Sequence, residues 1–311
     1  MKSALHTGGE TLHEHDLGLS HDWVVLQRQN QERRRLLGML TGLGGAVLLP
    51  GCGGGGSDSG TSITAATTST AASSTATTTS SSSSSSTTST STACIADPAE
   101  TAGPYPADGT NSANGSISNV LVASGIVRSD IRSSFGSTTA TAAGLPMTLT
   151  ITLVNTNAAC AVLAGYAIYL WHCNALGKYS LYDLPAENYL RGVQVTDSAG
   201  QVTFSSIFPG TYSGRYPHIH FEVYRNANTA TQGSNSLLTS QMCLPRDIAS
   251  AVYTANSTVY TGSSANLAQV TIASDNVFGD NTAAQIAAQT PVLSGSTSAG
   301  YTGTIVVGLA L

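Results

Sequence analysis

The stretch GRYPHIHFEVY, residues 214–224, combines a strand-like alternation of residues with a pair of histidines. Successive side chains of a β-strand point to opposite faces, so residues two apart share a face. One face of this predicted strand carries His218, His220, Glu222 and Tyr224. The other carries Ile219, Phe221 and Val223, which we expect to face the core. The pattern therefore predicts a sheet that presents two imidazoles side by side, close enough to bind one metal ion.

Histidine is scarce in this chain, and after His21 only three are present. A lone His-x-His pattern is a weak sign of a metal site, because histidine also occurs as an ordinary strand residue. The neighbouring residues strengthen the indication: Tyr212, Arg215 and Tyr216 precede His218 in a segment that contains a Pro-Gly turn. A turn of this kind can fold a side chain back over the strand that follows it.

The composition divides the chain of 311 residues into parts. Residues 53–93 are almost entirely Gly, Ser, Thr and Ala. Such a segment cannot bury enough apolar surface to offset its chain entropy, so we expect a disordered linker there. Residues 94–311 have the size of one all-β domain and contain all twelve tyrosines. The net charge of −5, without a basic stripe, disfavours nucleic-acid binding.

Residues 1–52 have the features of an export signal. Arg33, Arg34 and Arg35 precede an apolar run that is too short and too rich in glycine for a membrane-spanning helix. The long polar leader is similar to a twin-arginine signal, and LPGC is similar to a lipobox ending at Cys52, the lipidated residue. We expect an exported lipoprotein, periplasmic or at the cell surface, that contacts the membrane only through its lipid anchor. The alternative is an ordinary secretory signal cleaved near the same place.

Four cysteines follow, namely Cys94, Cys160, Cys173 and Cys243. An even number in an exported domain predicts two disulfides, for which three pairings are possible. A metal site that includes Cys173 and its neighbour His172 is the competing interpretation. It is disfavoured because the sequence has no C-x-x-C spacing and an exported chain meets oxidising conditions.

The remainder of the domain indicates short strands separated by turns rich in Gly, Pro and Asn. In MTLTITLV (147–154) apolar residues alternate strictly with others, which predicts one core-facing side. The other predicted strands are GYAIYLWHC (165–173), GQVTFSSI (200–207), AQVTIAS (268–274) and YTGTIVVGLAL (301–311). No long segment has a helical period, and NTAAQIAAQ (281–289) is at most a short helix. Together these features predict an all-β domain with the architecture of a β-sandwich.

Four segments together resemble the intradiol ring-cleavage dioxygenases, a family that includes the protocatechuate and catechol dioxygenases. They are ETAGPYP (100–106), LWHCNALGKYSLYD (170–183), YLRGVQVTDSAGQVTFSSIFPGTYSGRYPHIHFEV (189–223) and LLTSQMC (237–243). The resemblance covers nearly the whole domain and is specific in the order and spacing of its motifs. It implies a β-sandwich of the intradiol dioxygenase type over residues 94–311.

The resemblance implies one Fe(III) ion per domain, held by two tyrosines and two histidines. By motif these are Tyr179 in GKYS, Tyr212 in PGTY, and His218 and His220 in PHIH. Phenolate oxygens are hard, anionic donors, so two of them favour Fe(III) over Fe(II). A metal ion also promotes loss of the tyrosine proton, which is otherwise unfavourable near neutral pH.

The resemblance further implies roles for residues around the metal. Arg215 matches an arginine that stabilises bound substrate, and Gln241 matches a glutamine behind the ligands. Tyr105 in GPYP borders the substrate pocket, and Tyr182 is a further candidate substrate contact. Tyr212 is implied to leave the metal and act as a base. The implied reaction uses O2 to cleave the ring of a small aromatic diol, of the catechol type, between its two hydroxylated carbons.

Several features depart from the family pattern. A linker takes the place of the helical N-terminal segment of the catechol-cleaving branch. RYPH (215–218) replaces the more usual Arg-Pro-Ala-His, and Met242 and Cys243 follow Gln241 where an aromatic pair is usual. The loop between His220 and Gln241 is long and polar. These departures border the expected pocket and leave all four ligands in place.

Two other functions compete with a dioxygenase. A non-catalytic β-sandwich lipoprotein that binds carbohydrate or a protein partner would hold no metal and would tolerate replacement of Tyr179. An exported copper or zinc protein would use His172 together with His218 and His220. In its predicted strand His172 lies on the opposite face from Trp171, so we expect His172 to be structural.

Overall fold

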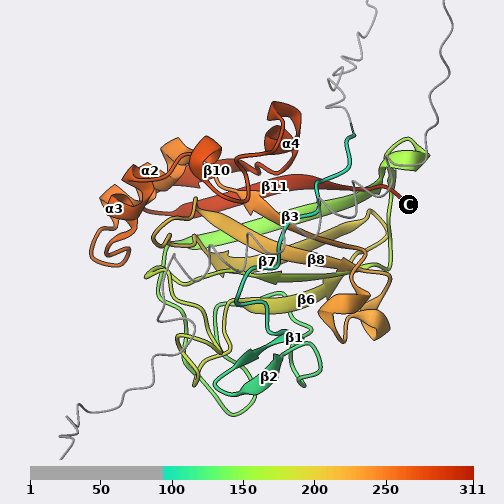
Figure 1. Cartoon of the computed structure of the whole chain (residues 1–311), viewed down its shortest axis with the longest axis horizontal. Coiled ribbons are helices and arrows are strands. Elements are labelled where there is room, and N and C mark those ends of the chain that lie inside the picture. The colour runs from blue at the N-terminus through green and yellow to red at the C-terminus, as the bar shows by residue number, and fades with distance from the viewer. Residues whose placement is uncertain (1–93) are drawn as a thin grey trace, which may run out of the picture. The chain divides into compact units, whose positions relative to one another are not determined.

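Residues 94–311 are described by the computed structural model. The predicted export signal, the predicted linker and Cys52 lie outside these residues. The described part of the chain forms two large β-sheets and a small two-stranded one, with helices in its C-terminal part (Figure 1). None of the helices in this part is long and apolar enough to cross a membrane.

The first sheet has five strands arranged around β3 (Pro146–Asn155). The strand order is β10 (Val292–Ser296), β11 (Gly300–Leu309), β3 and β4 (Ala161–Val162), and β7 (Gln201–Ile207) also pairs with β3. β11 runs parallel to β3, with Ile305 opposite Ile151. β10, β4 and β7 pair antiparallel with their neighbours, so this sheet is mixed.

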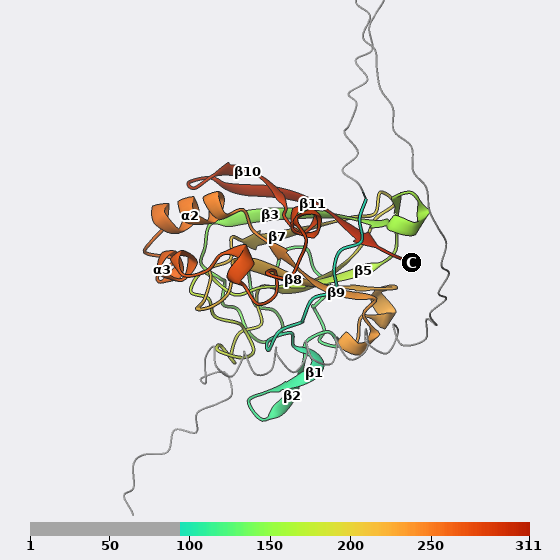
Figure 2. The same cartoon turned by 45° about the horizontal axis from the view of Figure 1, so that its top comes forward.

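The second sheet has four antiparallel strands. Their order is β6 (Arg191–Val195), β5 (Ala167–Trp171), β8 (His218–Tyr224) and β9 (Leu238–Cys243). β1 (Asp108–Ala113) and β2 (Ser116–Asn119) form a separate hairpin. Figure 2 shows the two sheets as layers, with the β1–β2 hairpin beyond the second sheet.

The main core fills the space between the two sheets. Leu149, Ile151 and Leu153 of β3 are buried there, as the alternation in the sequence predicts. The apolar residues Phe221 and Val223 of β8 enter the same core from the opposite sheet. Burial of each large apolar side chain contributes about 1.5–3 kcal/mol, and this shared core is what joins the sheets. The predicted β-sandwich is therefore confirmed for the described residues.

The other face of β8, which carries the two histidines, is buried as well. A second apolar cluster lies on this outer face of the second sheet and includes Tyr169 and Trp171 of β5 and Tyr224 of β8. Segments that precede β3 in the sequence cover it, with Val120 and Ile126 among their buried residues. The histidine pair therefore lies beneath a layer of chain and not on an open sheet surface.

The C-terminal part contains more helix than the sequence predicts. α2 (Arg246–Ala255) has ten residues and buries Ala249, Val252 and Tyr253, a spacing of three and four that the sequence analysis did not recognise. α4 (Ala283–Ala288) confirms the predicted short helix.

The predicted strand at 268–274 is wrong. This segment begins at the end of α3 (Ser263–Ala268) and ends in a 3-10 turn at Ile272–Ser274. The side chains of Thr271 and Ser274 each bond the main chain of the other, and such local bonds compete with strand pairing.

The cysteines form one disulfide among the described residues, Cys94–Cys160, where the sequence predicted two. Cys173 and Cys243 are free and buried. The Cys173 thiol donates to the Gly210 carbonyl, 3.4 Å away, and burial raises its pKa to about 12. Cys173 follows β5 and Cys243 ends β9, and both thiols are buried and free, so the prediction of a second disulfide is wrong.

The N-terminal arm is fastened to β11 by Asp97. Its N–H donates to the Gly308 carbonyl at 2.9 Å, and its Oδ2 accepts from the Gly308 N–H at 2.7 Å. Its Oδ1 has no hydrogen-bond partner among the described residues. Burial raises the pKa of Asp97 from 3.8 to about 7, against the smaller effect of the Gly308 hydrogen bond.

We predict that Asp97 makes the fold less stable as the pH rises. Because the folded-state pKa is raised, the protonated carboxyl contributes stability that is fully present below about pH 3.8 and is lost as the pH rises through about 7. One pKa unit corresponds to about 1.4 kcal/mol, so the loss is at most about 4 kcal/mol. In thermal unfolding, Asp97→Asn should lack this part of the pH dependence. A variant that follows the wild-type profile would contradict the assignment.

Candidate metal centre

Four polar side chains meet on the outer face of the second sheet. The hydroxyl of Tyr179 lies 3.3 Å from Nε2 of His218 and 3.2 Å from Nε2 of His220. The hydroxyl of Tyr212 lies 3.4 Å from Nε2 of His218. The structure thus brings together, from two turns and one strand, all four residues that the motifs indicate as ligands.

Tyr179 comes from a tight turn that follows β5. The side chain of Asn174 accepts two main-chain N–H groups of this turn, and the N–H of Tyr179 donates to Asp183 Oδ2 at 2.7 Å. Gly177 has a φ of +74°, and a Cβ there would lie 3.1 Å from Cβ of Tyr212. A residue without a side chain is therefore needed for the two tyrosine-bearing turns to approach each other.

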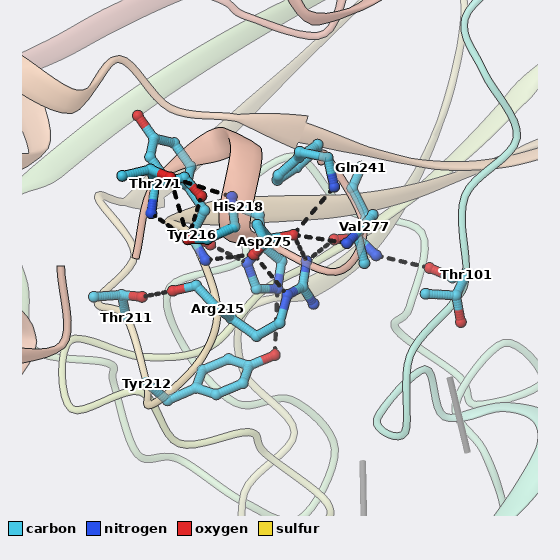
Figure 3. A network of polar contacts seen from close by, with 12 residues as sticks. Thr101, Thr211, Tyr212, Arg215, Tyr216, His218, Gln241, Thr271, Asp275 and Val277 are labelled. Carbon is cyan, nitrogen blue, oxygen red and sulfur yellow. Dashed lines mark hydrogen bonds and ion pairs between the residues drawn. The ribbon is translucent and has the colours of Figure 1, made fainter. Parts of the chain in front are cut away.

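The turn that carries Tyr212 is held by α3 and by its own side chains. The N–H of Thr211 donates to Ser263 Oγ at 3.2 Å, and the carbonyl of Thr211 accepts from the Asn266 amide at 3.0 Å. The hydroxyl of Thr211 donates to the Arg215 carbonyl at 2.7 Å (Figure 3). These bonds close the chain between Tyr212 and β8 into a fixed loop.

The two histidines are held in different ways. Nδ1 of His218 donates to the carbonyl of Tyr216 at 2.5 Å, which fixes the tautomer and leaves the lone pair of Nε2 facing the tyrosines. The ring of His220 stacks on Trp171, with centroids 4.8 Å apart and an interplanar angle of 7°. Gly103 approaches the same ring closely, since a Cβ there would lie 3.3 Å from Cε1 of His220. His220 is therefore oriented by packing.

Burial determines the charge state of these groups. It lowers the pKa of His218 to about 3, and the positive charge of Arg215 adds to the effect. Burial and then the charge of His218 lower the pKa of His220 well below its ordinary value. Burial followed by the proximity of Tyr212 raises the pKa of Tyr179 well above its ordinary value. The imidazoles are thus neutral, the form that binds metal, and the buried phenol needs a nearby cation to ionise.

This donor set suits a hard, highly charged cation. Two neutral imidazoles point their Nε2 atoms at two phenols, which become anionic oxygen donors once they ionise. Within residues 94–311, no group of three or more His, Cys, Asp and Glu side chains is arranged to hold a metal ion. Tyrosine oxygens make up half of the candidate set, and they distinguish it from the usual zinc sites.

His172 does not join this cluster. Its Nδ1 lies 2.7 Å from the Cys173 carbonyl, and its Nε2 lies 2.7 Å from Oγ of Ser206 on β7 in the first sheet. Both ring nitrogens are therefore engaged on the far side of β5 from His220. A copper or zinc site formed by all three histidines is contradicted, and the structural role expected for His172 is supported.

Arg215 and Gln241 lie behind the donors in a buried polar network (Figure 3). Nε of Arg215 donates to Asp275 Oδ2 at 3.0 Å, and its NH2 group donates to Gln241 Oε1 at 2.7 Å. The amide of Gln241 in turn donates to the Thr101 carbonyl at 2.8 Å. The network connects β9, the segment before β8 and the N-terminal segment that leads to Tyr105. Asp275 is a member that the sequence analysis missed.

Arg191 is a second residue whose role the sequence analysis missed. Its buried guanidinium donates to the carbonyls of Tyr105, Pro106 and Ser180 at 2.9–3.0 Å. It also donates to the hydroxyls of Ser180 and Tyr169, each at 3.0 Å. Arg191 therefore joins the loop that carries Tyr105 to the residue that follows Tyr179.

The structure places Tyr105 and Tyr182 beside the donors. The ring centroid of Tyr105 lies 4.7 Å from that of Tyr179 and 5.2 Å from that of Tyr182. The hydroxyl of Tyr182 donates to Asn111 Oδ1 at 2.6 Å and accepts from the Ala107 N–H at 2.8 Å. Tyr182 thus anchors the loop that contains Tyr105.

Comparisons with known proteins agree with the sequence motifs. Residues 132–259 match the family model described as "Dioxygenase". An intradiol ring-cleavage dioxygenase from Tetranychus urticae has a similar structure, with a TM-score of 0.52 and 22% identity over 70% of this chain and 95% of that chain. A catechol 1,2-dioxygenase from Pseudomonas arvilla C-1 gives a TM-score of 0.41 and 18% identity over 68% of this chain and 62% of that one. Among curated proteins, none matches this sequence.

The resemblance to the intradiol ring-cleavage dioxygenase family is therefore confirmed. The matched region contains Tyr179, Tyr212, His218 and His220, and the fold is that of the Tetranychus dioxygenase. The segment that carries Tyr105 lies outside the matched region.

We predict that Gly103→Ala weakens Fe(III) binding more than Gly136→Ala does. The two glycines have similar positive φ angles, +70° and +75°, so both substitutions strain the backbone by about 1 kcal/mol. Only at position 103 does the added Cβ meet a side chain, that of His220, whereas nothing lies within 4 Å at position 136. Competition with a chelator should show about tenfold weaker binding for Gly103→Ala, equivalent to about 1.4 kcal/mol. Equal affinities of the two variants would refute this role.

Proposed function

We propose that the protein is a ferric dioxygenase that opens catechol-type rings between the two hydroxylated carbons. The observation that carries this proposal is the approach of two tyrosine hydroxyls to buried imidazole nitrogens at 3.2–3.4 Å. The match of residues 132–259 to a dioxygenase family, and the fold of the domain, support the same class of reaction.

Fe(III) would be held by Tyr179, Tyr212, His218 and His220. When bound, it would supply Lewis acidity, which favours the ionised form of nearby phenolic oxygens. Tyr179 would depend on this effect, because burial raises its pKa and so disfavours its ionised form when no cation is near. The neutral imidazoles would complete the donor set without adding charge.

We assign the role of base to Tyr212. Tyr212 is half-buried, whereas the Tyr179 side chain is buried. The Tyr212 oxygen is therefore the better placed of the two to take a phenolic proton from an entering catechol. Tyr179 stays in place throughout.

Arg215 supplies a fixed positive charge beside the two tyrosines. Burial acts to lower its pKa, but the charge of Asp275 and the hydrogen bond to it more than offset this effect, so the pKa is raised and the guanidinium stays protonated. We propose that it stabilises negative charge that develops on the substrate ring as O2 attacks. Because Asp275 and Gln241 already hold it in place, little reorganisation is needed when that charge appears.

The substrate itself supplies the electrons for the reaction. The bond between the two hydroxylated carbons breaks, and each of these carbons gains one oxygen atom from O2. Both atoms of O2 thus enter the product, a muconate-type diacid, and no external reductant is required. Tyr105 is proposed to border the ring during this step, with Tyr182 supporting it through ring contact.

We predict that the iron-loaded protein converts one or more members of a panel of catechols and hydroxyquinols to ring-opened diacids. With labelled O2, mass spectrometry should find one labelled oxygen in each new carboxylate. Tyr179→Phe keeps the ring and removes one donor, so it should give no product. A semialdehyde product would mean cleavage beside the diol and would contradict the proposal. No turnover across the panel would favour the non-catalytic binding function.

We further propose that residues 1–52 export the protein and that Cys52 carries a lipid anchor. The three consecutive arginines, the apolar run and the LPGC sequence support this proposal. Residues 53–93 would then serve as a tether of Gly, Ser and Thr between the anchor and the domain.

We predict that replacement of Arg33, Arg34 and Arg35 with lysine traps the protein inside the cell, because twin-arginine transport depends on arginine. Cys52→Ser should release the protein from the membrane fraction, because no acyl chain can be attached. Cell fractionation with immunoblotting measures both effects. Normal localisation of both variants would show that the signal has been misassigned.

A further inference from the structure

Asp275 occupies the centre of the buried network behind the metal centre (Figure 3). Its Oδ2 accepts from Nε of Arg215 at 3.0 Å and from the N–H of Tyr216 at 2.6 Å. Its Oδ1 accepts from the N–H groups of Val277 and Phe278 at 2.9 and 3.1 Å. The Asp275 carboxylate therefore fixes the side chain of Arg215 and the main chain of Tyr216.

Tyr216 connects Asp275 to a candidate ligand. Its N–H donates to Asp275, and its carbonyl accepts from Nδ1 of His218 at 2.5 Å. Its ring meets that of Phe278 edge to face, with centroids 6.3 Å apart and an interplanar angle of 85°. The segment that begins at Asp275 thus holds Tyr216 by both main chain and side chain, and the orientation of the His218 ring depends on where Tyr216 is held.

The bond from Tyr216 requires a residue other than proline at this position. This chain has Arg-Tyr-Pro-His at 215–218. Proline has no N–H, so a proline at position 216 could not donate to a carboxylate. The hydrogen bond to Asp275 therefore depends on the presence at position 216 of a residue with an N–H, here tyrosine.

We propose that Asp275 is a positioning residue for the metal centre. It holds Tyr216, and through Tyr216 the ring of His218, in addition to pairing with Arg215. This inference rests on the proposed function in one respect, namely that His218 is a metal ligand.

The two roles of Asp275 can be separated by mutation. If Arg215 is replaced by methionine, the carboxylate keeps three main-chain N–H donors, those of Tyr216, Val277 and Phe278. Hydrogen bonds of this kind stabilise the ionised form of a carboxylate. Arg215→Met should therefore leave Tyr216 and His218 in place, whereas Asp275→Asn replaces one accepting oxygen with an amide that cannot accept.

The test is a double-mutant cycle on Fe(III) retention. The wild type, Arg215→Met, Asp275→Asn and the double variant are loaded with Fe(III), and the half-life of the bound metal is measured against a chelator. We expect Arg215→Met to retain Fe(III) like the wild type. Asp275→Asn and the double variant should lose it at least about tenfold faster, a change equivalent to about 1.4 kcal/mol, and their visible absorption bands should shift.

One further protein, a control variant, makes the result specific. Asp97→Asn is the matched control, since it makes the same substitution at a buried carboxyl that accepts a main-chain N–H outside the network. It should retain Fe(III) like the wild type.

Asp275→Asn could fail to fold because Arg215 is left without its carboxylate. In that case the Fe(III) retention of the double variant tests the inference, because that variant removes both charges.

Retention of Fe(III) by the double variant at the wild-type rate would overturn the inference, because the only effect of Asp275 would then be to neutralise Arg215. Equally fast loss from Asp97→Asn would also overturn it, since the effect would be general to buried carboxyls. A wild-type protein that binds no Fe(III) would instead overturn the proposed function, and the inference with it. The two failures are therefore distinguishable.

Discussion

The site depends on a single constraint, the burial of both faces of β8. The apolar face enters the core between the sheets, and the face that carries His218 and His220 is covered by chain that precedes β3. Burial keeps both imidazoles neutral. The Tyr216 carbonyl orients His218 and the Trp171 ring orients His220, so that their Nε2 atoms lie near the tyrosine hydroxyls. Polar groups buried in this way are costly unless they find partners, so the covering segments must be held accurately.

Two buried arginines, Arg191 and Arg215, hold much of the chain around the site in place. Arg191 uses all of its N–H groups on neutral oxygens, three of them carbonyls of the segments beside Tyr105 and Tyr179. Arg215 is paired with the carboxylate of Asp275. Arg191 thus joins the segments beside Tyr105 and Tyr179, and Arg215 provides a charge that is paired with Asp275 next to the donors. Such a rigid arrangement of the two arginines suits a site in which negative charge develops on the substrate.

The sequence predicts the strands and the histidine pair because both follow from local patterns, whereas Tyr179 and Tyr212 were implied as ligands by the resemblance. Alternation over 147–154 and 218–224 indicates strands and their core faces, and the spacing of two places the histidines together. The helix α2 was missed because its buried residues span less than two turns. The prediction of a strand at 268–274 was wrong because the side chains of Thr271 and Ser274 form local hydrogen bonds with each other's main chain.

Contacts across the fold could not be predicted from such patterns. Asp275 lies 60 residues from Arg215 in sequence, in a segment without a recognisable motif, and only the packing of the 3-10 turn against the segment before β8 brings them together. Arg191 lies in one of the segments that carry the resemblance, yet nothing local indicates that it bonds a loop 86 residues away. The roles of the four donors as ligands stay a prediction, which the convergence of their atoms supports.

Anomalous diffraction at the iron absorption edge, from crystals of natively expressed protein, is the most direct test of the metal centre. We expect one strong peak per domain, located among the hydroxyls of Tyr179 and Tyr212 and the Nε2 atoms of His218 and His220. A peak bound elsewhere, or a zinc signal at full occupancy among the same four atoms, would contradict the assignment of this cluster as a ferric site.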